Sequence, residues 1–271
     1  MSSTKAPWWR DPFVVVNGGV SLMVVFCFFA HPLKYVRVTG DCSSNWLFLG
    51  APNSPPVCCD RSNEAPCYPG MHEMHIISTG QAAWVLPLTA VFFNFGVSVF
   101  LPSVPYRQVS ALFNRLGLYF AIMVFRTVVL YILFNVIEHS LFPRPKSCWY
   151  AKYRRNNKCL DGFDHADHIV LYMVHFLAIA CFEWKILDKE SAHPLKLFFL
   201  RGWLLLLALL ACYGIYHTAA YFHSAWENVI GMLVAQIFVM YPLYSLAQDN
   251  LRQLHPAISL RHFVYVGKAA H

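Results

Sequence analysis

Long apolar stretches alternate with short polar segments along most of this chain. A helix needs about 20 predominantly apolar residues to cross the hydrocarbon core of a bilayer. Six stretches have that length, at about 12–31, 76–100, 112–137, 168–187, 196–219 and 226–246. The pattern therefore predicts an all-α membrane protein with six transmembrane helices.

Polar residues interrupt two of the predicted spans. Asn94 lies in the second span, and Arg126 and Asn135 lie in the third. Because unpaired polar groups are costly in hydrocarbon, we expect these helices to turn their polar faces towards protein. Arg126 is expected to extend to the membrane surface or to pair with a buried acid, and a functional role is a third possibility.

The number of spans sets the topology. Six spans place both termini on one side of the membrane and two long loops, about 32–75 and 138–167, on the other. The first stretch is too long for the core of a signal peptide, so we interpret it as a retained anchor. The whole chain, 1–271, is predicted to form a single membrane domain.

Composition agrees with this assignment. Of the 271 residues, 57% are hydrophobic and 13% are charged, whereas soluble domains carry about 25% charged residues. The sequence contains neither a P-loop nor a Gly-rich dinucleotide fingerprint. We expect membrane lipids, and not nucleic acid, among the partners.

Cysteines indicate which side faces an oxidising compartment. Three of the nine, Cys27, Cys181 and Cys212, lie in predicted spans, and the other six lie in the two long loops. Disulfides persist in oxidising compartments, so the loops are expected to face a lumen or the exterior, and the termini the cytosol. Metal binding by the first loop is the competing interpretation, although Cys58 and Cys59 lack standard zinc spacing. The disulfide candidates are Cys42, Cys58, Cys59, Cys67, Cys148 and Cys159.

Titratable side chains gather where the predicted spans meet the loop side. Ionisable groups close to a bilayer are functional candidates by default, and the topology brings three such clusters to one membrane face. They are Glu138 and His139 at the end of the third span, Asp164, His165, Asp167 and His168 before the fourth, and His217, His223 and Glu227 around the turn between the fifth and sixth.

The spacing of these residues favours phosphate chemistry. His223 and Glu227 are four apart and share a helix face, so the carboxylate can orient the imidazole and leave its other nitrogen as a nucleophile or base. His168 and His223 lie near helix N-termini, which attract phosphate. One histidine attacking phosphorus and another protonating the leaving oxygen suffice for phosphoryl transfer without a metal. For Asp164 and Asp167, helix capping is the simpler interpretation.

A basic run precedes the second cluster. The segment RPKSCWYAKYRRNNK, 144–158, includes Arg154 and Arg155. It is either a solvated loop or a funnel that attracts anions.

Two segments resemble motifs of the fat storage-inducing transmembrane (FIT) family. GFDHADH, 162–168, is similar to the family's Gly-Phe-Asp-x-Ser-Gly-His, and YFHSAWENVIG, 221–231, is similar to its Tyr-Phe-His motif and the helix that follows. The resemblance extends over about 76–246. It includes an Ile-Glu-His segment at Glu138-His139 and a cysteine pair at Cys148 and Cys159.

This resemblance implies a fold and an activity. FIT proteins are six-span endoplasmic reticulum proteins related to lipid phosphate phosphatases, with a lumenal active site. They are described as acyl-CoA diphosphatases, which cleave fatty acyl-CoA to acyl 4′-phosphopantetheine and adenosine 3′,5′-bisphosphate, and they support lipid droplet formation and endoplasmic reticulum structure. The resemblance implies long-chain acyl-CoA as substrate, diacylglycerol or triacylglycerol as possible lipid partners, and no cofactor or metal.

Residue by residue, the resemblance assigns catalytic roles. His223 would be the nucleophile, Glu227 would orient it, and His168 would be the general acid. The expected substrate contacts are Asp164, Asp167, His165, His217, Glu138, His139, Arg154 and Arg155.

Two positions depart from the related patterns. Ala166-Asp167 stand where the family has Ser-Gly, so a hydroxyl donor is lost and a carboxylate is placed beside an anionic substrate. Asp167 is expected either to point away from the substrate or to be a functional substitution. His217 stands where lipid phosphate phosphatases carry an arginine, and is expected to hold phosphate more weakly.

Three other functions stay open at this stage. The chain could be a phosphatase of phosphatidate-like lipids, or a metal-dependent lipid hydrolase with Asp164, His168 and His223 as zinc ligands. It could also be a non-catalytic protein that binds neutral lipid or shapes membranes, if Asp167 has disabled the site. The sequence does not indicate an oligomeric state.

Overall fold

All regular structure in the described part of the chain is helical. The computed structural model describes residues 8–30, 77–78, 81–100, 109–141, 163, 165–190, 194–255 and 258–264. Five helices are long and apolar enough to cross a membrane, namely Pro12–Ala30, Ser110–Glu138, Asp167–Lys189, Pro194–Ala220 and Ala225–Ala247. Each corresponds to a predicted span, and no predicted end differs from the observed end by more than two residues. The all-α prediction is thus confirmed for the described residues, with five helices long and apolar enough to be membrane spans.

The remaining predicted span, 76–100, forms a shorter helix than expected. Helix α3 covers Ala82–Phe100, 19 residues, and the side chains that the structure describes in it form the apolar stretch Ala82–Val97. Pro87 lies inside this helix, where a proline removes one backbone hydrogen bond. The described stretch is apolar, but it does not by itself show a sixth membrane crossing.

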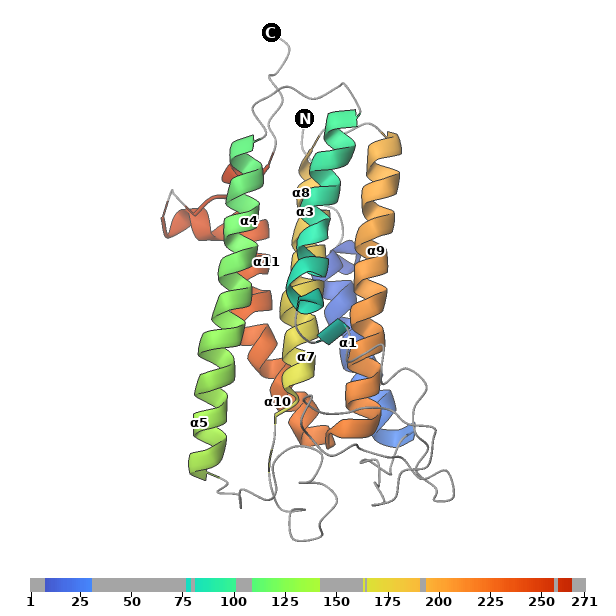
Figure 1. Ribbon diagram of the computed structural model, residues 1–271, viewed down its shortest axis with the longest axis vertical. Coiled ribbons are helices and arrows are strands. Elements are labelled where there is room, and N and C mark those ends of the chain that lie inside the picture. Colours follow the sequence, from blue (N-terminus) through green and yellow to red (C-terminus); the bar gives the residue numbers. More distant parts are fainter. Residues whose placement is uncertain are drawn as a thin grey trace.

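The long helices run in alternating directions along one bundle (Figure 1). In chain order they comprise α1 (Pro12–Ala30), α3, α4 (Val109–Val124), α5 (Tyr131–Leu141), α7 (Asp167–Leu171), α8 (Ala178–Lys189), α9 (Pro194–His217), α10 (Ala225–Ala235) and α11 (Tyr241–Ala247). The end of α5, the start of α7, the end of α9 and the start of α10 lie together at the lower end of the bundle in Figure 1. We call this the histidine end.

Four of the long helices contain a π-helical stretch. These stretches are Phe125–Leu130, Tyr172–Leu177, Thr218–Phe222 and Gln236–Met240. They join α4 to α5, α7 to α8 and α10 to α11, and they lead from α9 to the turn before α10. Short π-helical insertions are rare and often lie at functional sites. Arg126 lies in the first of them, and His223 follows the third directly.

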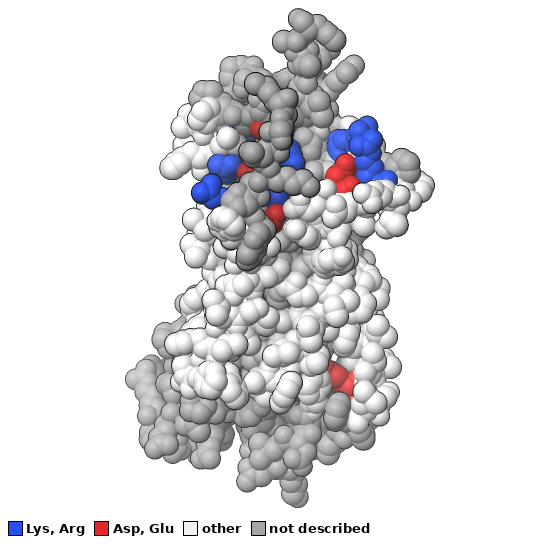
Figure 2. Space-filling view, turned by 180° about the vertical axis from the view of Figure 1, so that it is seen from behind, with Lys and Arg blue, Asp and Glu red and all other residues white. Residues whose placement is uncertain are grey.

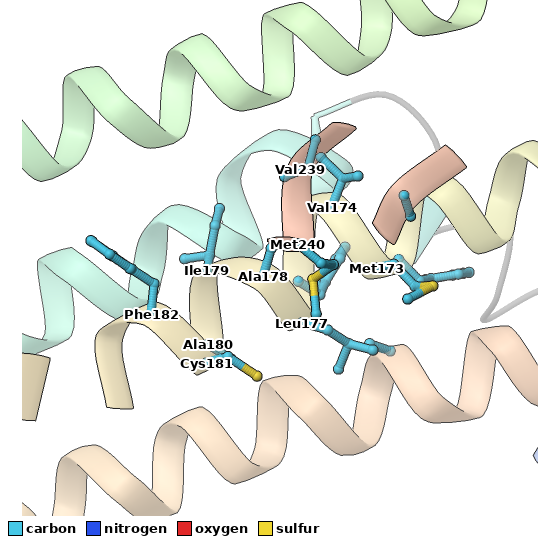
Figure 3. Close-up of a cluster of buried hydrophobic side chains, with 14 of the residues drawn as sticks. Met173, Val174, Leu177, Ala178, Ile179, Ala180, Cys181, Phe182, Val239 and Met240 are labelled. Atoms are coloured by element: carbon cyan, nitrogen blue, oxygen red, sulfur yellow. The ribbon is translucent and has the colours of Figure 1, made fainter. Parts of the chain in front are cut away.

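The helix Asp167–Lys189 forms the centre of the bundle. Of its apolar window, 89% is buried, against 17% to 44% for the other four membrane-length helices. Its side chains pack against the π-helical stretch at Val239 and Met240 (Figure 3). Gly214 of α9 lies directly under the ring of Tyr172, where a Cβ would meet ring atoms at 2.2 Å. The central helix is therefore enclosed by protein rather than by lipid.

The outer surface is apolar along the middle of the bundle. In Figure 2 the Lys, Arg, Asp and Glu residues that the structure describes gather mainly towards one end, with an uncharged belt below them. Large apolar side chains are exposed on the outer helices, among them Leu22, Phe29, Phe113, Phe198 and Tyr241. Asn94 and Arg126 are buried, so the prediction that these two turn towards protein is confirmed.

A buried ionic network closes the opposite end of the bundle. The guanidinium of Arg115 is fully buried, lies 3.1 Å from Glu183 and also pairs with Glu190. The hydroxyl of Tyr119 donates to Glu183 at 2.6 Å. Arg115 Nε donates to the carbonyl of Phe263 at 2.7 Å. The network joins α4 to the end of α8 and holds the segment after α11 against them.

Candidate functional site

The two histidine motifs meet at the histidine end. The backbone N–H of Ala166 donates to the carbonyl of Glu227 at 3.2 Å. A Cβ at Gly231 would lie 2.8 Å from the carbonyl oxygen of Ala166, so only glycine lets α10 approach this closely. His168 follows Ala166 in the first turn of α7, and His223 precedes α10. The two motifs, more than fifty residues apart in the sequence, are thus in contact where α7 and α10 begin.

A capping box fixes the second motif. The Ser224 side chain accepts from the backbone N–H of Glu227 at 3.4 Å, and the Glu227 carboxylate accepts from the backbone N–H of Ser224 at 2.7 Å. The side chain of Asn228 donates to the carbonyl of His223 at 3.3 Å. This reciprocal pattern satisfies backbone donors at the helix start. The turn that carries His223 is therefore held on both sides.

Glu227 also faces the imidazole of His223. Its Oε2 atom lies 3.5 Å from His223 Nδ1, and both side chains are buried. A neutral imidazole with its proton on Nδ1, towards the carboxylate, carries its lone pair on Nε2. The separation is longer than the roughly 2.7–3.2 Å of an ordinary N–H···O hydrogen bond. The prediction that Glu227 faces His223 is confirmed, but the two do not share a helix face, because His223 is extended and precedes Ser224, the N-cap of α10.

Glu138 and His165 bind each other at the same end. Glu138 Oε1 lies 2.5 Å from His165 Nδ1 and accepts from the His165 backbone N–H at 2.7 Å. Both residues are buried, and the ring of Phe134 lies 5.4 Å from that of His165. The pair ties the end of α5 to the turn before α7. Contact of either residue with a substrate stays a prediction.

Asp167 pairs with Arg126. Arg126 Nη2 contacts the Asp167 carboxylate. The same nitrogen donates a hydrogen bond to the main-chain carbonyl of Asp167 at 3.1 Å. Pairing with an acid, one of the alternatives for Arg126, is confirmed. Asp167 is not the N-cap of its helix, because Ala166 occupies that position and Asp167 is the first helical residue. The simple capping interpretation of Asp167 was therefore wrong.

His168 and His217 lie on different helices near this contact. His168 is half-buried in the first turn of α7. His217 is the last residue of α9 and is buried between two tyrosines, its ring 4.4 Å from that of Tyr213 and 5.5 Å from that of Tyr216. Phosphate binding by His217 stays a prediction.

Several predicted site residues lie outside the described part of the chain. These are Asp164, Arg154, Arg155 and the six loop cysteines, together with the side chain of His139. Cys27, Cys181 and Cys212 lie in described helices as thiols. Among the described residues, no group of three or more His, Cys, Asp and Glu side chains is arranged to hold a metal ion.

Three features of the site were not predicted from the sequence. The capping box has a readable signal in Ser224-Ala-Trp-Glu227, which matches the S-x-x-E pattern. Gly231 also stands in the quoted motif, but only the structure shows which backbone it meets. The partner of Arg126 lies 41 residues away, and nothing in the local pattern singles out Asp167.

Comparison with known proteins adds no assignment. The chain matches no family model, no curated protein and no solved structure. The resemblance to the FIT family therefore rests on the two histidine motifs and the Ile-Glu-His segment.

Proposed function

We propose that this protein is an acyl-CoA diphosphatase that hydrolyses fatty acyl-CoA to acyl 4′-phosphopantetheine and adenosine 3′,5′-bisphosphate. The observation that carries the proposal is the contact between the histidine motifs, in which Ala166 bonds to Glu227 and Gly231 admits the turn of Ala166. This contact brings the helix starts that bear His168 and His223 against each other. Two imidazoles beside two helix N-termini suit an anionic, phosphate-containing substrate.

The proposed reaction uses one histidine as nucleophile and one as acid. His223 Nε2 attacks one phosphorus of the diphosphate, the bond from that phosphorus to the bridging oxygen breaks, and the electron pair goes to that oxygen. His168, as imidazolium, donates a proton to the leaving oxygen. Water then attacks the phosphohistidine, the P–N bond breaks and its electron pair returns to Nε2, while a proton of the water passes to His168. Glu227 orients His223 and stabilises the positive charge that develops on its ring.

The membrane arrangement completes the proposal. We place α3 as a sixth span, both termini in the cytosol, and the histidine end in the lumen of the endoplasmic reticulum. The alternating direction of the helices and the six loop cysteines support this arrangement. A lumenal site would take long-chain acyl-CoA with its acyl chain among the helices, and it would serve endoplasmic reticulum lipid homeostasis and lipid droplet formation.

Product analysis tests this function. Full-length protein purified in detergent is given oleoyl-CoA, with and without a chelator, beside His168→Ala and His223→Ala variants. We expect wild-type protein to release acyl 4′-phosphopantetheine whether or not the chelator is present. Loss of a general acid or base typically costs about 100-fold to 10,000-fold, so both variants should fall to background.

Other outcomes point to the other functions. Turnover that stops with chelator and returns with zinc would indicate a metal-dependent hydrolase. Preferential hydrolysis of phosphatidate in competition would indicate a lipid phosphate phosphatase. Lipid binding without turnover of either substrate would indicate a non-catalytic neutral-lipid protein.

A further inference from the structure

Arg126 is a buried cation close to the histidines. Its side chain is 7% exposed, whereas that of its partner Asp167 is 25% exposed. Both contacts to Asp167 use the same nitrogen, Nη2. The Nε atom is buried and makes no hydrogen bond to any residue that the structure describes. The guanidinium therefore has donor capacity that the resting contacts leave unused.

The position of the pair links it to the candidate site. Asp167 immediately precedes His168, and its other carboxylate oxygen, Oδ1, lies 4.0 Å from His165 Nε2. The main-chain contact from Arg126 to Asp167 keeps the guanidinium at the start of α7 whichever way the carboxylate turns. A buried arginine is costly without a counter-ion, and Asp167 supplies one in the absence of substrate.

We propose that Arg126 binds the diphosphate of the substrate, and that Asp167 is a built-in counter-ion which the diphosphate displaces. This inference rests on the proposed function. A guanidinium offers two parallel N–H donors that match two phosphate oxygens, and this bidentate geometry is stronger than a single contact to a carboxylate. Rotation of the Asp167 side chain towards solvent is sufficient to open the site, and the backbone contact holds Arg126 in place meanwhile.

This arrangement accounts for the departure at Ala166-Asp167. The carboxylate beside the substrate is neutralised at rest, and it reserves Arg126 for an anion of higher charge. Specificity follows, because a monovalent anion competes poorly with Asp167 whereas a diphosphate replaces one charge with two or more. Arg126 then stabilises negative charge on the phosphorus oxygens as the bridging bond breaks.

Binding of inorganic diphosphate tests the exchange directly. Full-length wild-type protein in detergent is compared with Arg126→Gln, Arg126→Lys, Asp167→Asn and the Arg126→Gln/Asp167→Asn double variant, by the diphosphate concentration that raises the melting temperature. Removing the competing carboxylate in Asp167→Asn should tighten binding about tenfold, and Arg126→Gln should weaken it about tenfold or more. Arg126→Lys should lie between wild type and Arg126→Gln. The double variant should bind like Arg126→Gln, because no arginine is left to release.

A purely structural ion pair predicts the opposite pattern. Both single variants would then bind diphosphate more weakly and melt lower, and the double variant would recover towards wild type; that result overturns the proposal. If Arg126→Gln does not fold, Asp167→Asn decides alone, since unchanged or weaker binding contradicts the exchange. The exposed pair Arg201–Asp188, 2.8 Å apart, is the matched control, and Arg201→Gln and Asp188→Asn should leave binding unchanged.

Turnover of oleoyl-CoA separates this inference from the proposed function. Hydrolysis by wild type with a KM that Asp167→Asn and Arg126→Lys leave unchanged would refute the role of Arg126 and keep the diphosphatase. Absence of hydrolysis together with Arg126-dependent diphosphate binding would refute the diphosphatase and keep the anion site.

Discussion

Glu227 serves two partners with one carboxylate. It closes the capping box with Ser224 and it faces His223 through the same oxygen, Oε2. The helix cap therefore sets the direction of the catalytic candidate, and structural and chemical roles can be separated only by paired substitutions.

We expect Glu227→Gln to lose activity without losing the helix cap. Glutamine also completes a capping box, but it lacks the charge that stabilises the His223 imidazolium, so kcat for oleoyl-CoA should fall about 100-fold. Ser224→Ala is the control, since it keeps the charge and costs about 1 kcal/mol of stability. Equal losses of kcat in both variants would mean that Glu227 acts only through the cap. Measuring kcat and the melting temperature of both variants separates the role of the charge from the role of the cap.

Some residues of the site were predictable and others were not. The pairing of His223 with Glu227 was predicted from their separation of four residues, although His223 is extended and precedes the helix, and the capping box is what brings the Glu227 carboxylate back to it. The Arg126–Asp167 and Glu138–His165 pairs join segments that are far apart in the sequence. The sequence therefore indicated polar residues at one membrane face, but it did not show which of them form pairs. Long-range pairs of this kind depend on how the helices pack.

At the level of helices, the ends of the spans were predicted well because the thickness of the bilayer fixes their length. The π-helical stretches were not predicted, since they have no compositional signal; Phe125–Leu130 reads as ordinary apolar helix. α3 came out shorter than expected because apolar composition alone does not show where a helix begins. Helix type and location therefore follow from the sequence more readily than helix irregularity does.

The contact between α7 and α10 depends on Gly231. We expect Gly231→Ala to push α10 away from the carbonyl of Ala166 and to destabilise the protein by about 1–3 kcal/mol, as overpacking typically does. Turnover of oleoyl-CoA should fall even in protein that stays folded, because His168 and His223 move apart.

The matched control is Gly202→Ala on α9, where a Cβ would meet nothing within 4 Å. Melting temperature and oleoyl-CoA turnover should stay near wild-type values in that variant. If Gly231→Ala also kept its melting temperature and turnover near wild-type values, the close approach of the two motifs would not be needed for stability or activity.

Considered as a whole, the bundle has a buried ionic network at one end and the candidate site at the other. The ionic network of Arg115, Glu183 and Glu190 lies at the end opposite the histidines. The central helix between the two ends has 23 residues, a length on the order of 30 Å at 1.5 Å per residue. Within this network, burial raises the pKa of the Glu190 carboxyl, and the neighbouring Arg115 guanidinium opposes that rise by stabilising the charged form.

We expect Arg115→Gln to lower stability while sparing the site. Breaking a buried ion pair by removing one partner costs about 3–5 kcal/mol, so the melting temperature should drop strongly. KM for oleoyl-CoA should stay near wild type in protein that remains folded, because the proposed diphosphate site lies at the other end of the bundle. The exposed Arg201→Gln should cost about 1 kcal/mol or less. A large rise in KM with Arg115→Gln would contradict this separation.

The enclosure of the helix Asp167–Lys189 also bears on how the protein is made. This helix leaves the ribosome after α1, α3, α4 and α5 but before α9, α10 and α11, which complete its enclosure. During that interval the apolar flank that faces α9, α10 and α11 is uncovered, whereas His175 and Glu183 already have partners on α3 and α4, namely Ala83, Arg115 and Tyr119. It follows that the polar groups of this helix can be paired before its apolar flank is covered by the later helices. Truncation before Pro194 would leave a helix whose flank meets lipid instead of α9, α10 and α11, which its apolar composition allows.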